Sequence, residues 1–79
     1  MSNKGITFEI IEHIGVIGKR TDYYKIVWTK EVNIVAWNGG APKIDIREWD
    51  TDHIKMSRGI TLTEEEAKAL YEALKGRYE

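Results

Sequence analysis

The stretch EVNIVAWNGGAPKIDIREW, residues 31–49, constrains the fold more than any other part of this sequence. Its first half has the alternating pattern of a strand, and its second half alternates isoleucine with charged residues. The central NGGAP is a turn signal, because asparagine and glycine tolerate positive φ. We therefore predict two antiparallel strands, with Ile44 and Ile46 facing a core. The opposite face of the second strand would carry Lys43, Asp45, Arg47 and Trp49.

Residues 7–19 predict an earlier strand, because apolar side chains alternate there with polar ones. Its apolar face would carry Phe8, Ile10, Ile14 and Val16. Its other face would carry Glu9, His13 and Lys19. Gly15 and Gly18 indicate a bend or a bulge in this strand.

The same alternation runs through residues 25–37. The apolar face of this strand would carry Ile26, Trp28, Val32, Ile34 and Ala36. Lys30 interrupts that face, so we expect a bulge, an edge or a change of curvature near residues 29–31. The segment GITLT, residues 59–63, predicts a short fourth strand.

The last residues, from Thr63 onward, predict one helix. Thr63 and Glu66 form a capping box, in which each side chain bonds the backbone N–H of the other residue. An apolar stripe at helical spacing follows, made of Ala67, Leu70, Tyr71, Leu74 and Tyr78. The predicted fold is therefore α+β: a four-stranded curved antiparallel sheet followed by one C-terminal helix (ββββα). One helix covers only part of one sheet face, so we expect the remainder to meet a twin chain or a ligand.

The length of 79 residues predicts a single domain, residues 1–79. A chain this short buries only about 60% of the surface that its unfolded form exposes. It has no cysteine, which excludes disulfides and thiolate metal sites and leaves homodimerisation as the way to enlarge the core. No stretch approaches the roughly 18 apolar residues of a membrane span, and the N-terminus lacks a signal-peptide pattern. We therefore expect a cytoplasmic protein that does not associate with a membrane.

The histidines and carboxylates that could serve in catalysis are not spaced so that they could form an active site. His13 and His53 are far apart in the sequence, and Asp45 and Glu48 lie on opposite faces of one predicted strand. NGGAP lacks both the lysine–serine pair and the following helix of a phosphate-binding loop. We therefore predict a protein that is not an enzyme and that has no catalytic residue, no metal site and no cofactor.

Charge is distributed unevenly along the chain, although the net charge is only −1. The segment between residues 19 and 47 has a local balance of +3. Its six basic residues are Lys19, Arg20, Lys25, Lys30, Lys43 and Arg47, and its three acidic residues are Asp22, Glu31 and Asp45. The simplest interpretation is an ordinary solvated surface. However, aromatic residues are interspersed with these cations, and proteins bind single-stranded nucleic acid with cations on the phosphates and rings on the bases.

The three tryptophans receive different interpretations. Trp37 is predicted to stack on a base, because Ile34 and Ala36 of its own strand already supply the apolar face. Trp28 lies on that apolar face, which favours a core or interface position. Trp49 lies beside Arg47 and is open to either role, a base-stacking residue or a dimer contact.

KIDIREW, followed after a short turn by KMSRGITLTEEEAKAL, resembles the positive cofactor four family of transcriptional coactivators, which bind single-stranded DNA. That family has an IDIREY strand, a basic glycine-containing loop, a GISLT strand and a helix. The resemblance covers roughly Trp28 to the end of the chain. The whole chain, including EIIEHIGVI and WTKEVNIVAWNGG, is similar to small bacterial relatives of the YdbC type.

This resemblance implies a homodimer whose curved sheets form grooves for single strands and whose helices pack at the dimer centre. It implies that Trp37 stacks on a base, that Lys43 and Arg47 bind phosphate, and that Lys30 corresponds approximately to a phosphate-binding lysine. This sequence departs from the family pattern at three places that bear on function. NGGAP replaces a lysine-rich turn, Asp50 replaces an exposed tryptophan, and a regulatory tail rich in serine and lysine is absent. Coactivator activity is therefore not carried over.

Together these patterns and the resemblance predict a homodimeric protein of the bacterial cytoplasm, associated with the nucleoid, that binds single-stranded DNA with little sequence preference. It would act in transcription, replication or repair, with proteins of those processes as further partners. Trp37 would stack, with Trp28 and Asn38 as secondary candidates. The cations predicted to bind the DNA backbone are Lys25, Lys30, Lys43, Arg47 and Arg58.

Two alternatives stay open. A protein-interaction module would use the exposed tryptophans and a sheet edge to bind a partner chain by strand addition. A single-stranded RNA-binding protein would use the same residues, because stacking and phosphate contacts do not strongly distinguish the sugar.

Overall fold

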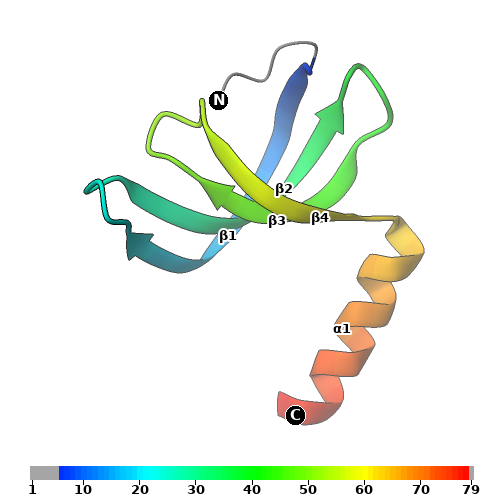
Figure 1. The fold of residues 1–79 in the computed structure, drawn as a ribbon. Helices are drawn as coiled ribbons and strands as arrows, with labels where there is room; N and C mark the ends of the chain where they lie inside the picture. The colour runs from blue at the N-terminus through cyan, green and yellow to red at the C-terminus, as the bar shows by residue number, and fades with distance from the viewer. Residues whose placement is uncertain (1–5, 79) are drawn as a thin grey trace.

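The computed structural model describes residues 6–78, which form four strands followed by one helix (Figure 1). The elements are β1 (Phe8–Thr21), β2 (Val27–Trp37), β3 (Lys43–Trp49), β4 (Met56–Leu62) and α1 (Glu64–Tyr78). The strands lie in sequence order in one sheet, and each neighbouring pair is antiparallel. The predicted ββββα order and the antiparallel sheet are confirmed.

The strand register defines two faces of the sheet, because residues directly opposite each other in an antiparallel pair point to the same side. The face that we call the inner face carries Phe8, Ile10, Glu31, Asn33, Val35, Trp37, Lys43, Asp45, Arg47 and Trp49. The face that we call the outer face carries Lys30, Val32, Ile34, Ile44, Ile46, Glu48 and Ile60. The prediction that Lys43, Asp45, Arg47 and Trp49 share one face is confirmed.

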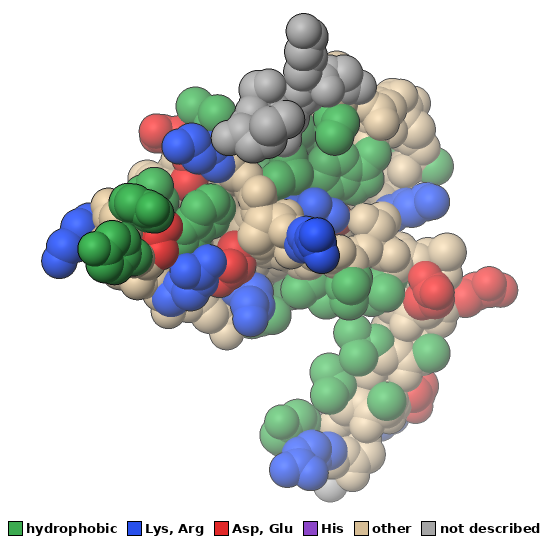
Figure 2. All heavy atoms as spheres, in the orientation of Figure 1, with side chains coloured by type: hydrophobic (Ala, Val, Ile, Leu, Met, Phe, Trp, Pro, Cys, Tyr) green, Lys and Arg blue, Asp and Glu red, His purple; other side chains and the backbone are tan. Residues whose placement is uncertain are grey.

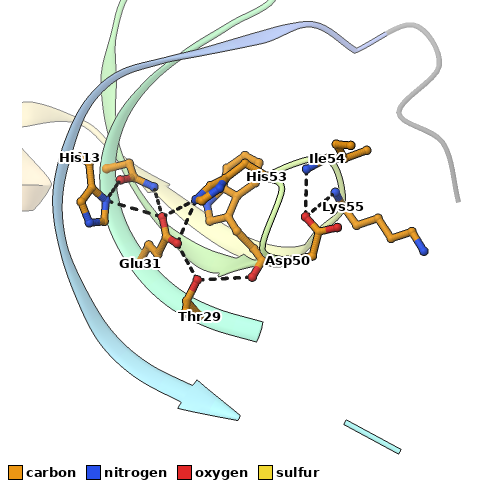
Figure 3. A network of polar contacts seen from close by, with 9 residues as sticks. His13, Thr29, Glu31, Asp50, His53, Ile54 and Lys55 are labelled. Atoms are coloured by element: carbon orange, nitrogen blue, oxygen red, sulfur yellow. Dashed lines mark hydrogen bonds and ion pairs between the residues drawn. The ribbon is translucent and has the colours of Figure 1, made fainter. Parts of the chain in front are cut away.

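The inner face forms the core of the single chain. Its most buried side chains are at most 3% exposed and comprise Glu31, Asn33, Val35, Asp45 and Trp49. Ile44 and Ile46 are only half-buried on the outer face, so the prediction that they face the core is wrong for the single chain. The reason is coverage: β1 curves around the inner side of the sheet, and His53 packs against Trp49 there (Figure 3).

Three β-bulges interrupt β1, and each adds one residue opposite the regular strand β2. The extra residues are Ile11, Ile14 and Ile17, and all three are exposed. The predicted irregularity at Gly15 and Gly18 is confirmed. The predicted faces of Ile14, His13 and Lys19 are wrong, because each bulge shifts the alternation by one residue. His13 therefore points to the inner face, where its Nδ1 lies 2.7 Å from Asn33 Oδ1.

The irregularity expected near Lys30 lies on the neighbouring strand. The register of β2 with β3 is unbroken from Thr29 to Val35, whereas the third bulge of β1 places Gly18 opposite Lys30. Gly18 has no side chain and therefore leaves space beside Lys30 on the outer face. The lysine is exposed there although the residues on either side of it along that face are apolar.

The turn between β2 and β3 has the backbone that its sequence predicts. Asn38 has φ 52° and Gly39 has φ 75°, which are left-handed values that asparagine and glycine tolerate. The Asn38 side chain also accepts a hydrogen bond from the backbone N–H of Thr7 (2.8 Å). This turn is therefore attached to the residue that precedes β1.

The helix begins with the predicted capping box. The Thr63 N–H donates to Glu66 Oε1 (2.9 Å), and the Glu66 N–H donates to Thr63 Oγ1 (3.1 Å). The helix runs away from the sheet, and none of its residues from Glu64 to Tyr78 is buried (Figure 1). Its predicted apolar stripe is therefore uncovered in the single chain. No helix within residues 6–78 is long and apolar enough to cross a membrane.

Candidate nucleic-acid interface

Trp37 lies at the end of β2, where the inner face opens into a hollow of about 300 Å³. The hollow is lined by Ile6, Trp37, Asn38, Arg47, Met56 and Thr61. The indole ring packs at a tilt against Phe8, with 5.8 Å between ring centres, and the Arg47 guanidinium carbon lies 4.6 Å from its centre. The ring is therefore held in place while part of it borders open space. This arrangement suits the stacking of a planar group.

Arg47 is less available than its sequence position suggests. Its guanidinium makes two hydrogen bonds to the fully buried carboxylate of Asp45, at 2.6 and 2.8 Å. The Arg47 side chain is only 14% exposed, and it also donates to the Ser57 carbonyl (3.3 Å). Thr61 Oγ1 donates a further hydrogen bond to Asp45 (2.9 Å). Arg47 therefore compensates a buried charge and supports Trp37, which leaves it little capacity for a phosphate.

Lys43 lies one step along the inner face from Trp37. It is opposite Val35 in the register, and Trp37 is two residues beyond Val35 on the same side of β2. Side chains at such diagonal positions are about 7–8 Å apart, so a long side chain spans the gap. Lys43 is exposed, as is Asn38 in the adjoining turn. Trp37, Asn38, Lys43 and Arg47 therefore form one group, which we call the inner site.

A second group crosses the outer face from one edge of the sheet to the other. We call it the outer row, and it consists of Arg20, Trp28, Lys30, Glu48 and Arg58. Arg20 makes a two-pronged ion pair with Glu48, with both hydrogen bonds at 2.8 Å. Lys30 lies directly opposite Glu48, and Lys30 and Arg58 line the same surface hollow of about 340 Å³. Figure 2 shows Lys and Arg side chains over the β1–β2 end of the sheet.

The pKa values of Arg20 and Glu48 are shifted in the directions that keep both groups of the ion pair charged. The hydrogen bond to Glu48 raises the pKa of the Arg20 guanidinium, and the reciprocal bond from Arg20 lowers the pKa of the Glu48 carboxyl. The charge of Lys30 contributes to the lower pKa of Glu48. At neutral pH the row therefore contains three cations and one anion.

Trp28 belongs to the outer row and is half-buried. Its indole Nε1 donates to Asp22 Oδ2 (2.9 Å), and the Arg20 guanidinium carbon lies 5.7 Å from its ring centre. The hydrogen bond from Trp28 lowers the pKa of the Asp22 carboxyl. Trp28 therefore has a bonded edge and a partly open face, on the opposite side of the sheet from Trp37.

The predicted site residues consequently fall into separate groups. The inner site includes Trp37, Asn38, Lys43 and Arg47, and the outer row includes Trp28, Lys30 and Arg58. Lys25 belongs to neither and lies exposed at the tip of the β1–β2 hairpin, with φ 69°. Trp49 is fully buried between Phe8 and His53. Its ring is therefore accessible neither to a base nor to a second copy of the chain, and neither role considered for it fits this position.

A buried polar network occupies the inner face behind these groups (Figure 3). Glu31 accepts hydrogen bonds from Asn33 Nδ2 (3.1 Å) and Thr29 Oγ1, and His53 Nε2 lies 3.0 Å from its carboxylate. His13 Nδ1 lies 3.6 Å from the same carboxylate. Among residues 6–78 no set of His, Asp or Glu side chains is arranged to hold a metal ion. The network is thus a satisfied polar part of the core.

The sequence patterns did not single out Arg20, Tyr23 and Tyr24 as site residues. Arg20 connects Trp28 to Glu48, and the two tyrosines project from the hairpin tip next to Lys25. A detectable signal was present, because two adjacent tyrosines in a short turn between strands have no core to enter.

An antiparallel sheet with cations and part-exposed indoles on both faces is typical of domains that bind single-stranded nucleic acid. Residues 24–73 match the family described as Transcriptional Coactivator p15 (PC4). The match covers more than half of the chain, and the chain belongs to this family, as the sequence motifs predicted. The family is known for binding single-stranded DNA, which supports a nucleic-acid-binding role for this chain.

A relative in Treponema pallidum (strain Nichols), described as an uncharacterized protein, is 45% identical over 47 residues. The aligned part is 60% of this chain and 55% of that relative, so this chain spans little more than half of its length. The family match starts at residue 24 and does not include β1. The bulged edge strand therefore lies outside the matched residues.

Proposed function

We propose that this protein binds single-stranded DNA with little sequence preference and acts, without catalysis, in transcription, replication or repair. The observation that carries the proposal is the inner site, where the Trp37 ring is held by Arg47 beside an open hollow. An aromatic ring fixed in this way accepts any base, since every base has a flat face, and each stacked base contributes about 1–3 kcal/mol. The exposed Lys43 is positioned for the adjoining phosphate.

Exposed lysine and arginine side chains support an electrostatic contribution to DNA binding. Four of the five predicted backbone-binding residues are exposed, namely Lys25, Lys30, Lys43 and Arg58, whereas Arg47 is held by Asp45. If these four residues each neutralise one phosphate, log K should fall with log salt at a slope of about −3, from the single-strand factor of roughly −0.7 per contact. The expected binding is consequently strong at low salt and weak at high salt.

We also propose that the functional unit is a homodimer. Four side chains of the apolar stripe of α1 and the outer-face residue Ile60 are exposed in the single chain, and no residue of the helix is buried. The four are Leu70, Tyr71, Leu74 and Tyr78. Figure 2 shows hydrophobic side chains along the helix and on the adjoining part of the sheet. A second copy of this chain would cover this surface and supply the core that a small domain lacks.

Strand addition, the basis of the protein-interaction alternative, is disfavoured at the β1 edge. Three bulges interrupt β1, and bulges on an edge strand disrupt the regular ladder that another strand would extend. At this edge the structure therefore gives that alternative less support than it gives binding of nucleic acid.

The test is a titration with a labelled oligothymidine of about 20 nucleotides, longer than the roughly 4–16 nucleotides that a comparable small domain occupies. Anisotropy and intrinsic tryptophan emission are recorded at two salt concentrations, in parallel with the duplex and an oligouridine of equal length. The expected result is salt-sensitive binding that prefers the single strand to the duplex and quenches tryptophan. Equal affinity for oligouridine would assign the function to RNA as well. No binding at micromolar protein would overturn the proposal.

A further inference from the structure

The tip of the β1–β2 hairpin presents the two most exposed large apolar side chains of the described chain. Tyr23 is 89% exposed and Tyr24 is 77% exposed. Their rings are in contact, with 5.3 Å between centres and an edge-to-face angle of 88°. The hairpin projects from the sheet at the left of Figure 1. Two adjacent rings in water bury little of their area, so folding of the single chain gains little from them.

The tip is a fixed structure. Asp22 Oδ1 accepts hydrogen bonds from the backbone N–H groups of Tyr24 (2.8 Å) and Ile26 (3.0 Å), and the Asp22 N–H donates to the Ile26 carbonyl (2.9 Å). The Lys25 N–H donates to the Asp22 carbonyl (3.0 Å), and Lys25 takes a left-handed φ of 69°. The turn therefore holds both tyrosines outward, which lowers the entropy cost of binding through them.

The same aspartate connects the tip to the outer row. Its second oxygen, Oδ2, accepts from Trp28 Nε1 (2.9 Å), and Trp28 lies beside Arg20, which bonds to Glu48. Aromatic side chains thus follow one another from the tip onto the outer face, next to the cations of the outer row. Between residues 19 and 25 the charge balance is three cations to one anion, since Lys19, Arg20 and Lys25 oppose Asp22.

We propose that Tyr23 and Tyr24 form an additional stacking platform for bases of a single-stranded nucleic acid, which extends the binding site from the outer row onto the hairpin tip. This inference rests on the proposed function. It follows from the positive charge of the tip, the link to Trp28 through Asp22, and the exposure of two rings on a hydrogen-bonded turn. A protein partner for the tip is the other occupant that the experiment must distinguish.

The length of the bound strand provides the test. The affinity of the full chain is measured for oligothymidines of about 8 and about 20 nucleotides, within and beyond the roughly 4–16 nucleotides of a small domain. In a Tyr23→Ala/Tyr24→Ala variant, affinity for the long strand should fall about 5- to 150-fold, which corresponds to one lost stacked base, while affinity for the short strand stays the same. Tyr23→Phe/Tyr24→Phe should bind both strands as the original chain does, because the ring is retained.

Ile11→Ala is the matched control, because it removes an exposed apolar side chain from a bulge of β1 far from the tip. It should bind both lengths normally. An unchanged affinity of the double alanine variant for the long strand would overturn the platform and direct attention to a protein partner at the tip. If the original chain bound neither length, the proposed function would fail and this inference with it. If Trp37→Ala weakened binding and the double alanine variant at the tip did not, the proposed function would stand and the tyrosine platform would be excluded.

Discussion

The guanidinium carbon of Arg47 lies 4.6 Å from the centre of the Trp37 ring, and the same guanidinium is paired with the buried carboxylate of Asp45. The two contacts hold the cation against one part of the indole. A base can therefore stack only where the ring borders the hollow. In the proposed site Arg47 would act on a ligand through Trp37, whereas Lys43 and Lys30 are exposed and would meet phosphates directly.

Replacing Arg47 should affect stability more than electrostatic binding. Arg47→Gln leaves Asp45 buried without its partner, which costs about 3–5 kcal/mol in comparable buried pairs. Urea unfolding measures this loss. The salt dependence of DNA binding by the folded variant should keep its slope, since Arg47 is not a free cation. A slope reduced by about 0.7 with unchanged stability would instead identify Arg47 as a phosphate ligand.

Replacing Lys30 should have the opposite effect. Lys30→Gln removes an exposed cation of the outer row, so the slope of log K against log salt should become less steep by about 0.7. Stability should change by no more than about 0.5 kcal/mol, as is usual for surface substitutions. Lys68→Gln, on an exposed part of α1, is the matched control and should leave the slope unchanged.

Removal of the Trp37 ring should weaken binding to DNA by the free energy that one stacked base contributes. Trp37→Ala is expected to lose about 1–3 kcal/mol of binding free energy, and Trp37→Phe should lose less because a ring remains. The measurement is the same oligothymidine titration by anisotropy, with urea unfolding to show that each variant is folded. Tryptophan quenching should also decrease in Trp37→Phe, since Trp49 is fully buried and contributes little. Full quenching in that variant would assign the stacking role to Trp28.

Local signals predicted the turns and the helix, because the residues that determine them are close in sequence. The Thr63–Glu66 capping box and the Asn38–Gly39 turn are examples. The identity of the core face was not predictable in this way. Alternation separates two faces, but burial depends on what covers each one, and β1 and the turn at His53 cover the inner face.

The candidate site was predicted in part, for the same reason. The period of two places Trp37, Lys43 and Arg47 on one face correctly. It does not reveal that Arg47 pairs with Asp45, two residues away on the same face, because pairing depends on how deeply each side chain is buried. In β1 the alternation does not predict the faces correctly, because three bulges each shift it by one residue. No sequence rule gives the positions of these bulges, one of which turns His13 toward Asn33 on the inner face. Tertiary contacts determine these features.

Disruption of the apolar stripe of α1 should separate the proposed dimer. Leu74→Glu places a charge in the middle of that stripe, where burial of an unpaired carboxylate is costly. Sedimentation should show a dimer for the original chain and a monomer for the variant. Helix content should be retained because Leu74 is exposed in the single chain. A variant that stays dimeric would locate the contact elsewhere.

Gly59 is required by close packing between β3 and β4. A Cβ added at this position would collide with Arg47 Cβ and with the Ile46 carbonyl oxygen. Gly59→Ala should therefore destabilise the protein by about 1–3 kcal/mol, as overpacking does in other cores. Gly76→Ala is the control, since an added Cβ there meets no atom within 4 Å, and it should stabilise the helix by up to about 1 kcal/mol. Equal stabilities of the two variants, measured by urea unfolding, would contradict the close approach.

Glu31 should make stability depend on acidic pH. Burial alone raises the pKa of its carboxyl, but hydrogen bonds from Thr29, Asn33 and His53 and the charge of His53 together lower that pKa below its ordinary value. A carboxyl with a lowered pKa in the folded state stabilises the protein above its unfolded pKa of about 4.3, and this contribution is lost as the pH falls through the folded value. The free energy of unfolding should therefore decrease below about pH 4.3.

Glu31→Gln tests this contribution, because it removes the titrating group and keeps the shape. At neutral pH the variant should be less stable by about 1–3 kcal/mol, the cost of leaving buried hydrogen-bonding groups badly matched, and its stability should fall less on acidification. Glu48→Gln is the control outside the buried network, since the Glu48 carboxyl also has a lowered pKa but pairs with the exposed Arg20 on the outer face. That control should retain most of the acid sensitivity. If Glu31→Gln lost as much stability on acidification as the original chain, the acid response would belong to the surface carboxyls and not to the buried network.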